Sequence, residues 1–340
     1  MNDVALLILS SLAAFFFTPA SARDFYEGKT VSLYIGTIPG GPYDAYGRLV
    51  ARHIGRHIPG NPSVVVLTMT GAGGRTAMGY MYNVAPKDGT AIATTVRSVP
   101  YDPLMGIGSA FDGRALSWLG STNSETSICV AWAATGIRSI QDVMKREMIV
   151  GTSGPSSTDA IIPSLMNSII GTHFKIVAGY KSSTETQMAM ERGEVDGRCG
   201  MTWNGLKSIK ANWLREHKVN ILSQFALEKE RELKEIPSVL DLAGTEADRA
   251  LVRVLAAPDE TGEPFFAPPG IPDERLHILR DAFDLTMKDE VFLADATNQG
   301  LEIKPMSGVA IDTLIAQLYA TPKEIIDRAA KVSGRVAGAE

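Results

Sequence analysis

The residues best suited to chemistry in this sequence are glycines and hydroxyl side chains that stand between apolar runs and amphipathic segments. The stretch 38-IPGGPYDAYGR-48 places Gly40 and Gly41 at such a junction. Glycine lets the backbone approach a ligand closely, and a helix that follows presents unpaired N–H groups and the positive end of its dipole. Such a turn is suited to bind an anion, either a carboxylate or a phosphate.

The same layout recurs three times further along the chain. The segments 70-TGAGGRTA-77, 151-GTSGPSSTDA-160 and 179-GYKSSTET-186 each follow an apolar run and are rich in Gly, Ser or Thr. In open α/β sheets, ligands bind at the carboxyl ends of strands, where turns of this kind lie. Four such turns predict a cleft lined by N–H and hydroxyl donors.

Charged and aromatic side chains near these turns are each open to two interpretations. Asp44 stands where a helix N-cap would, so it either only caps the helix or also faces the cleft as a hydrogen-bond acceptor. The basic residues near the turns either pair with a ligand carboxylate or form surface ion pairs: Arg48, Arg75, Lys181 and Arg198. The aromatic residues either pack internally or stack on a flat or apolar ligand: Tyr43, Tyr46, Tyr180 and Trp203.

The sequence lacks the usual patterns of nucleotide sites, nucleophilic enzymes and metal sites. No turn contains GxxxxGK[ST], GAGG lacks the full GxGxxG spacing, and GTSGP around Ser153 is not GxSxG. His53 and His57 lie four residues apart with no third ligand nearby, so they are expected to cover a helix face. We therefore expect no catalytic residues, no metal and no cofactor.

Strand-like runs alternate with helix-like segments over most of the chain, which predicts α/β architecture with mainly parallel sheets. Strands are expected at 31–37, 64–69, 91–96, 127–132, 148–152, 174–179, 219–225 and 251–256. Helices are expected at 43–57, 158–170, 183–192 and 205–216. The region 272–332 is expected to be helical apart from a short run at 301–304.

The chain of 340 residues exceeds the usual size of one α/β core, so two lobes are expected. The polar stretch 120-GSTNSETS-127 and the Pro-rich stretch 258–272 are the places where the chain is expected to pass between lobes. Residues 23–124 plus 253–340 would then form the first lobe and residues 125–252 the second. The helices after Pro272 are expected to pack on the first lobe.

The amino terminus and the two cysteines bear on where the protein works. Residues 4–17 form an apolar run and 20-ASA-22 is a small-residue cleavage pattern, which indicates a signal peptide cut after Ala22. The alternative is an uncleaved membrane anchor. In an exported chain Cys129 and Cys199 either pair or remain free thiols. The net charge of −5, with no Lys/Arg cluster, argues against nucleic acid as a partner.

Taken in order, several segments resemble the substrate-binding receptors of tripartite tricarboxylate transporters, often called the Bug family. The stretch 39–54 is similar to that family's Pro-Gly-Gly-x-x-Asp-x-x-x-Arg motif through Pro39, Gly40, Gly41, Asp44 and Arg48. Further similar segments follow in the family's order: 71-GAGGRTA-77, 85-APKDGTAIA-93, 118–132, 151-GTSGPSS-157, 179–197, 236-IPSVLDLAG-244 and 266–283.

This resemblance implies a two-lobed periplasmic binding protein of type II-like, Venus-flytrap form with a hinge between the lobes. It implies a non-enzymatic, monomeric receptor that captures a small organic carboxylate and delivers it to integral-membrane transporter subunits. By matching position it implies ligand contacts by Gly40, Gly41, Asp44, Thr152, Ser153 and Ser157. Together with residues of the same turns, the predicted ligand-binding set is Gly40, Gly41, Tyr43, Asp44, Gly73, Thr152, Ser153, Ser157, Lys181 and Trp203.

The sequence departs from the family pattern at two places that affect the expected ligand. Tyr43 stands where the family usually has a small residue, and Gly200 stands where it commonly has an aspartate. Asp196 keeps its place, with a structural role expected at the strand. Tyr43 and Trp203 favour a bulkier or aromatic acid. Two other functions stay open: a ligand-sensing adaptor for a membrane signalling protein, and an enzyme on a similar two-lobed fold.

Overall fold

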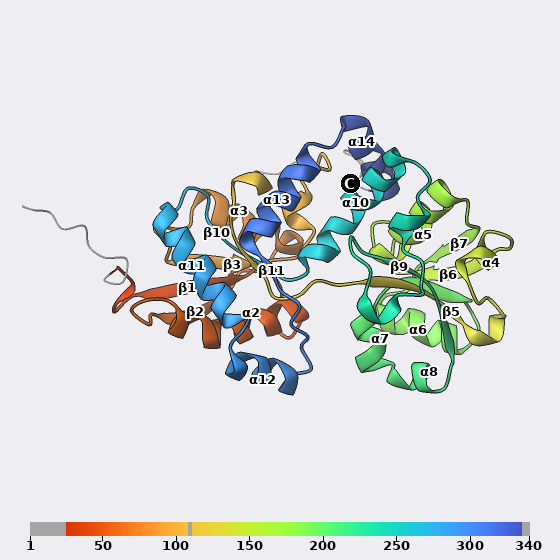
Figure 1. Ribbon diagram of the computed structural model, residues 1–340, viewed down its shortest axis with the longest axis horizontal. Helices are drawn as coiled ribbons and strands as arrows, with labels where there is room; N and C mark the ends of the chain where they lie inside the picture. The colour runs from red at the N-terminus through yellow and green to blue at the C-terminus, as the bar shows by residue number, and fades with distance from the viewer. Residues whose placement is uncertain (1–24, 108–110, 335–340) are drawn as a thin grey trace, which may run out of the picture.

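The computed structural model describes residues 25–107 and 111–334, and these form two α/β lobes, each built around its own sheet (Figure 1). The predicted cleavage site after Ala22 lies outside the described residues. The first sheet has the strand order β11-β4-β10-β3-β1-β2, and the second has the order β7-β6-β8-β5-β9. The predicted α/β architecture is therefore confirmed.

The first sheet combines a parallel half with an antiparallel half. Strands β1, β2 and β3 run parallel, whereas β10 is antiparallel to β3 and β4, and β11 is antiparallel to β4. The strand bounds are β1 Thr30–Ile35, β2 Ser63–Thr68, β3 Ala91–Thr94, β4 Ser117–Ser121, β10 Pro264–Ala267 and β11 Met306–Ser307. Parallel strands bring the predicted turns after β1 and β2 to one edge of the sheet.

The second sheet is arranged in a similar way. Strands β6, β7 and β8 are parallel, and β5 is antiparallel to both β8 and β9. The bounds are β5 Ser127–Trp132, β6 Met148–Thr152, β7 Phe174–Ala178, β8 Gly197–Thr202 and β9 Val219–Phe225. The predicted turns after β6 and β7 therefore also share one edge.

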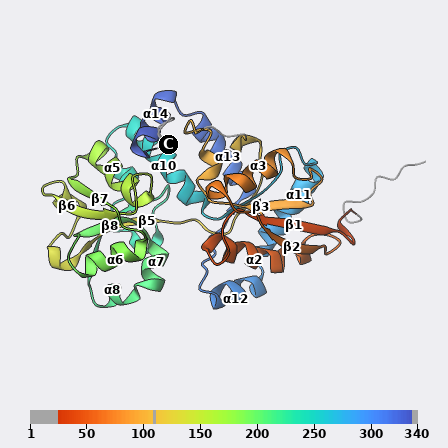
Figure 2. The same ribbon diagram turned by 180° about the vertical axis from the view of Figure 1, so that it is seen from behind.

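Helices cover both faces of each sheet because successive strand residues point to opposite faces. In β1, Val31, Leu33 and Ile35 pack against α2, α11 and α12, whereas Tyr34 belongs to the core under α3 and α13. Both ribbon views show α2 and α3 on opposite sides of this sheet (Figure 2). In the second lobe, α4 and α5 cover one face, and α6, α7 and α8 cover the other.

The helices have these bounds: α2 Pro42–Ile54, α3 Arg75–Asn83, α4 Ile140–Val143, α5 Thr158–Ile170, α6 Ser183–Glu191, α7 Trp203–Ile209, α8 Ala211–Arg215, α9 Val239–Leu242, α10 Glu246–Thr261, α11 Asp273–Thr286, α12 Glu290–Asn298, α13 Gly308–Tyr319 and α14 Lys323–Val332. Short 3-10 helices occur at Gly55–His57, Ala72–Gly74, Val99–Tyr101, Gly113–Ala115, Ala133–Thr135 and Arg231–Leu233.

Two crossing segments connect the sheets and lie side by side. The first runs from β4 to β5, and the second runs from the end of α10 to β10. The Thr122 N–H donates to the Glu263 carbonyl at 3.2 Å, and the Glu125 N–H donates to the Asp259 carbonyl at 2.9 Å. Gly262 has φ +42°, and a Cβ there would lie 2.0 Å from the Asn123 carbonyl oxygen. Only glycine allows the two crossings to approach this closely.

The structure departs from the expected elements in two ways. Residues 251–256 were expected as a strand but belong to α10, because a short apolar run does not distinguish a strand from a buried helix segment. The run at 301–304 is not helical, as expected, and the short strand β11 follows it at Met306–Ser307. Strands β4, β8 and β10 were not expected; β8 reads GRCGMT, in which two glycines and an arginine hide the strand pattern.

The final helix also departs from expectation. Helix α14 packs against α10 and against α5 of the second lobe, instead of packing on the first lobe. Its buried residues Ile325, Ile326 and Ala329 form one stripe, which seals the junction of the lobes on that side. The predicted boundary at residue 253 falls inside α10. The lobe boundaries 23–124 plus 253–340 and 125–252 otherwise stay a prediction.

The two cysteines, which the sequence left open, form a disulfide between Cys129 of β5 and Cys199 of β8. These strands are hydrogen-bonded neighbours in the second sheet. Both residues are buried. The disulfide therefore links β5 and β8, two adjacent strands in the interior of the second sheet.

Candidate functional site

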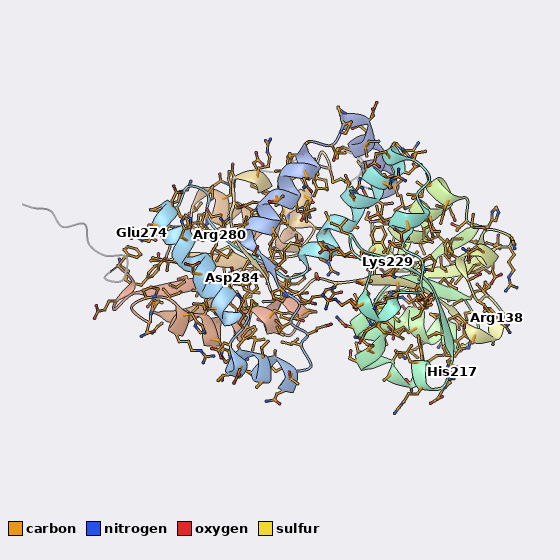
Figure 3. The ribbon with its side chains drawn as sticks, viewed as in Figure 1. Arg138, His217, Lys229, Glu274, Arg280 and Asp284 are labelled. Carbon is orange, nitrogen blue, oxygen red and sulfur yellow. A yellow bond between two sulfur atoms is a disulfide. The ribbon has the colours of Figure 1, made fainter. Side chains whose placement is uncertain are left out.

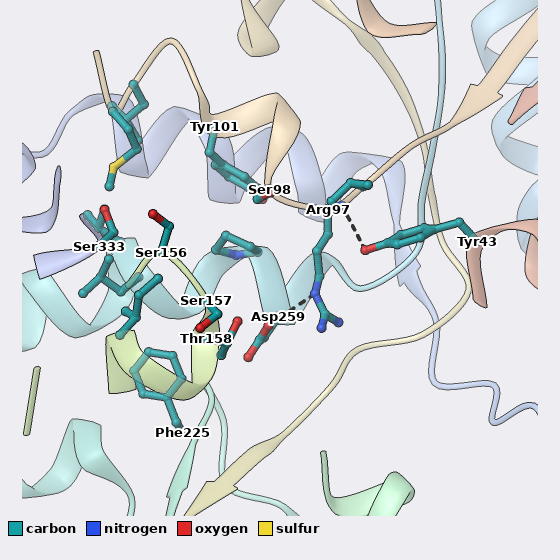
Figure 4. A pocket seen from close by; sticks show the side chains of 17 residues that line it. Tyr43, Arg97, Ser98, Tyr101, Ser156, Ser157, Thr158, Phe225, Asp259 and Ser333 are labelled. Atoms are coloured by element: carbon teal, nitrogen blue, oxygen red, sulfur yellow. Dashed lines mark hydrogen bonds and ion pairs between the residues drawn. The ribbon is translucent and has the colours of Figure 1, made fainter. Parts of the chain in front are cut away.

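A cavity of about 380 Å³ lies where the two lobes meet. The first lobe contributes Tyr43 and residues 96–105, the second lobe contributes residues 156–161 and Phe225, and α10 and Ser333 close the back. Figure 4 shows Tyr43 and Arg97 on one side of this cavity and the Ser156–Thr158 turn on the other. A ligand here would touch both lobes.

Arg97, which the sequence reasoning missed, is the central charged group of this cavity. It follows β3, and its backbone N–H donates to the Tyr43 hydroxyl at 3.1 Å. Its Nε lies 3.3 Å from Asp259 Oδ1 and its Nη1 lies 3.6 Å from Glu125 Oε2. Burial lowers the pKa of Arg97, but the facing Asp259, together with Tyr43 and Glu125, more than reverses this, so the guanidinium stays charged.

Arg97 and the crossing segments form a buried cluster with more acidic than basic groups. Glu263 is 3% exposed, and burial raises its pKa to about 7; Arg97 opposes this effect, and Glu125 adds to it. Burial also raises the pKa of Glu125. Asp259 accepts hydrogen bonds from Ser127 Oγ at 2.8 Å and pairs with Arg97. The protonation of these carboxyl groups therefore affects the stability of the region where the chain passes between the lobes.

A second cavity of about 500 Å³ lies between the start of α2 and the start of α7. Pro42 and Tyr46 line it from the first lobe, and residues Thr202 and 204–209 line it from the second. The crossing segments also line this cavity, through Asn123, Glu125 and Glu263, and so do residues 300–302. The two cavities share the crossing cluster as a common boundary.

The Pro-Gly-Gly turn is held by Asp44, but Asp44 is not the N-cap. Helix α2 begins at Pro42, with Gly41 as its N-cap. Asp44 Oδ2 accepts the Gly40 N–H at 3.0 Å and Oδ1 accepts Arg48 Nε at 2.9 Å. Burial opposes but does not cancel these bonds, which together lower the pKa of Asp44. Because a glycine caps α2, no cap side chain covers the first turn of the helix.

In the second lobe, the predicted hydroxyl residues surround a carboxylate that the sequence reasoning did not single out. Asp159 is buried and accepts hydrogen bonds from Thr152 Oγ1 at 2.5 Å, from Ser153 Oγ at 3.3 Å and from Ser157 Oγ. The Ser153 N–H also donates to Asp159, at 3.2 Å. A ligand carboxylate must therefore compete with Asp159 for these hydroxyl protons.

The remaining predicted residues lie outside the lining of the first cavity. Of the ten, only Tyr43 and Ser157 line it. Gly73 lies in the 3-10 turn before α3 with φ +63°, and Lys181 is exposed before α6. Trp203 begins α7, where its Nε1 donates to Glu232. Ligand contacts by these residues stay predictions.

The departure from the family pattern at Gly200 has a structural basis. Gly200 has φ +72°, and a Cβ there would lie 2.9–3.0 Å from backbone atoms of Thr158 and Asp159. Helix α5 thus begins directly against β8, which leaves no room for an aspartate. Asp196 has the expected structural role, because its Oδ2 accepts the Ile149 N–H at 2.8 Å.

The two histidines considered as metal ligands, His53 and His57, instead contact carboxylates of the same chain. His53 Nε2 of α2 lies 2.8 Å from Asp295 of α12, and His57 Nε2 of the 3-10 helix Gly55–His57 lies 2.8 Å from Asp289, the residue before α12. Across 25–107 and 111–334, no group of three or more His, Cys, Asp or Glu is placed to hold a metal ion. Over the same residues, no helix has both the length and the apolar character needed to cross a membrane.

The fold and the cavity between the lobes define the class as a two-lobed α/β solute-binding protein. The family model "Tripartite tricarboxylate transporter family receptor" matches residues 48–330, and the chain belongs to this family. It is a solute-binding receptor of the TctC type, as its sequence resemblance predicted.

Solved structures and a curated relative agree with this assignment. A TctC solute-binding protein from Polaromonas, solved without ligand, has a TM-score of 0.71 at 15% identity, covering 89% of this chain and 99% of its own. MatC from Rhodopseudomonas palustris, solved with malate, has a TM-score of 0.55 at 18% identity, covering 90% and 99%. A UPF0065 protein of the TAR-I ttuE-ttuC' intergenic region of Agrobacterium vitis is 22% identical, covering 72% and 70%.

Proposed function

We propose that this receptor captures a small organic carboxylate between its lobes and delivers it to the integral-membrane subunits of a tripartite tricarboxylate transporter. The observation that supports this most is the cavity that joins Tyr43 and Arg97 of the first lobe to Ser157 of the second. A charged guanidinium beside hydroxyl groups suits an anionic ligand. The related MatC, which was solved with malate, supports a carboxylate.

In this proposal the predicted residues have two kinds of role. Gly40, Gly41 and Tyr43 meet the ligand at the start of α2, where the first N–H groups of the helix have no partner within the helix. Asp44 holds that turn, and Thr152, Ser153 and Ser157 offer hydroxyl groups once the ligand displaces their bonds to Asp159. Closing of the lobes about the two crossings brings the turns at Gly73, Lys181 and Trp203 to the ligand.

We also propose that the mature receptor begins after Ala22 and works in the periplasm as a monomer, without enzymatic activity. Lobe closure of the Venus-flytrap kind would present a surface that the membrane subunits recognise. The disulfide is consistent with an exported protein, because disulfides persist in oxidising compartments.

A thermal-shift screen of mono- and dicarboxylic acids on the chain beginning at residue 23 tests the proposal. A true ligand at 100 times its dissociation constant adds roughly 2.7 kcal/mol to the free energy of unfolding. Arg97→Gln should abolish the shift. Arg138→Gln should not, because Arg138 lies at the far end of the second lobe (Figure 3). A folded protein that no carboxylate stabilises would refute the proposal.

A further inference from the structure

Arg198 of β8 is a buried cation that lies behind the hydroxyl-rich turns of the second lobe, and it is only 2% exposed. At the start of α6, its Nη1 donates to the Ser183 carbonyl at 3.1 Å and its Nη2 donates to the Ser183 hydroxyl at 3.3 Å. In the described part of the chain, the only carboxylate that comes as close as 4.0 Å to this guanidinium is Asp159, at the start of α5. Arg198 therefore stands between the beginnings of the two helices that follow the predicted turns.

The pairing of Arg198 with Asp159 is incomplete. Arg198 Nη2 lies 4.0 Å from Asp159 Oδ2, which is too long for a hydrogen bond. Burial lowers the pKa of Arg198, and Asp159 opposes this effect without cancelling it. A buried ion pair is favourable only when its geometry is close and its atoms are hydrogen-bonded. A shorter contact between these two side chains would therefore stabilise both charges.

The hydroxyl-rich turn supplies the hydrogen bonds that Asp159 now accepts. Its Oδ1 accepts from Thr152 Oγ1 and Ser157 Oγ, and its Oδ2 accepts from the Ser153 N–H and Ser153 Oγ. These are the groups that the proposed function assigns to a ligand carboxylate. An ionised carboxylate only accepts hydrogen bonds, so the ligand and Asp159 compete for the same donors. A ligand that takes them leaves Asp159 buried and charged, which costs free energy unless another partner is present.

We propose that Arg198 is a positioning residue for ligand binding: when a ligand carboxylate takes the donors of Ser153 and Ser157, Asp159 moves onto Arg198 and forms a direct ion pair. This inference rests on the proposed function, because it needs an anion between the lobes. The movement is short, since the distance from Nη2 to Oδ2 falls from 4.0 Å to about 2.8 Å in a charged hydrogen bond. Arg198 thereby compensates the charge of Asp159 behind the bound ligand.

Proton uptake on ligand binding tests this exchange of partners. The probe is whichever of succinate, malate, glutarate and adipate binds the wild type most tightly. Isothermal titration calorimetry at about pH 6.5, in buffers of different ionisation enthalpy, gives both the affinity and the number of protons taken up. In Arg198→Gln the displaced Asp159 has no cation, so it takes up a proton instead of staying charged. We expect this variant to bind about tenfold to a hundredfold more weakly and to take up about one proton more per ligand than the wild type.

Three further variants separate this role from a merely structural one. Arg198→Lys keeps the positive charge and should show the proton uptake of the wild type. In an Asp159→Asn background no carboxylate is displaced, so adding Arg198→Gln should change neither the affinity nor the proton uptake. This double variant leaves no buried charge unpaired, which covers the case that Arg198→Gln alone does not fold. Arg138→Gln removes an exposed positive charge at the far end of the second lobe and should change neither property (Figure 3).

The outcomes distinguish this inference from the proposed function. If Arg198→Gln binds the acid with the proton uptake of the wild type, the exchange is refuted and the carboxylate receptor stands, whether or not the affinity has fallen. The same holds if Arg198→Gln weakens binding as much in the Asp159→Asn background as in the wild type, because Arg198 then acts on the ligand without Asp159. If neither these four acids nor any other carboxylate binds the wild type, both proposals fail.

Discussion

Replacing Glu263 by glutamine should make the stability of the ligand-free protein less dependent on pH. In the fold, burial raises the pKa of Glu263 from its ordinary 4.5 to about 7. Between these values the folded protein holds a proton that the unfolded chain has released. The free energy of unfolding therefore falls as pH rises from about 4.5 to about 7, and it is level outside this window.

The size of this effect follows from the pKa difference. At 1.36 kcal/mol for each pH unit, the difference corresponds to a loss of about 3 kcal/mol between pH 4.5 and 7. Little screening by solvent is expected, because Glu263 is 3% exposed. Burial raises the pKa of Glu263 most, Arg97 and the Asn123 amide lower it, and Glu125 and Asp259 raise it further. A glutamine does not titrate, so it does not lose this stability. The free energy of unfolding of the variant therefore rises relative to that of the wild type as pH increases.

Urea unfolding at pH 5, 6, 7 and 8, followed by circular dichroism and tryptophan fluorescence, measures the difference. We expect Glu263→Gln to be more stable relative to the wild type at pH 8 than at pH 5, by about 2–3 kcal/mol. Some pH dependence should remain, because burial also raises the pKa of Glu125. Glu274→Gln serves as the charge control. Parallel stability profiles for the wild type and Glu263→Gln would show that the carboxyl group does not titrate as argued.

Three further substitutions test other parts of the structure. Replacing Cys129 and Cys199 by serine should lower the free energy of unfolding by roughly 4 kcal/mol, since the disulfide joins residues 70 apart in sequence; reductant should lower the melting temperature of the wild type but not of this variant. Gly200→Asp, which inserts the aspartate common in the family, should cost about 1–3 kcal/mol from strain at φ +72°, and an unchanged melting temperature would contradict the packing of α5 on β8. Asp44→Ala should lower the melting temperature because the Gly40 N–H loses its acceptor, and the ligand-induced shift should weaken but persist; complete loss of the shift would mean that Asp44 itself contacts the ligand.

Local sequence patterns were sufficient for most regular elements. The predicted strands 127–132, 148–152 and 219–225 and the predicted helix 158–170 coincide with β5, β6, β9 and α5. Alternating or helical spacing of apolar residues is a property of neighbouring positions, so it can be read without the fold. The order of the glycine- and hydroxyl-rich turns also indicated the family, which the match over residues 48–330 confirms.

Patterns failed where burial came from distant parts of the chain. The apolar residues within 251–256 belong to α10, which packs against α13 and α14, and this pattern cannot be distinguished locally from that of a buried strand. The same limit left the pairing of Cys129 with Cys199 open, since it depends on β5 and β8 lying next to each other.

The sequence by itself determined that this chain is a two-lobed α/β receptor with anion-suited turns. Only the tertiary structure decided which charges meet between the lobes. No sequence pattern singled out Arg97, Asp159 or Glu263. Burial places Arg97 and Glu263 beside partners far away in sequence, whereas Asp159 is buried among the hydroxyl groups of its own turn, 151–160. Burial and proximity set the strength of electrostatic interactions, and both are created only when the two sheets and their crossings assemble.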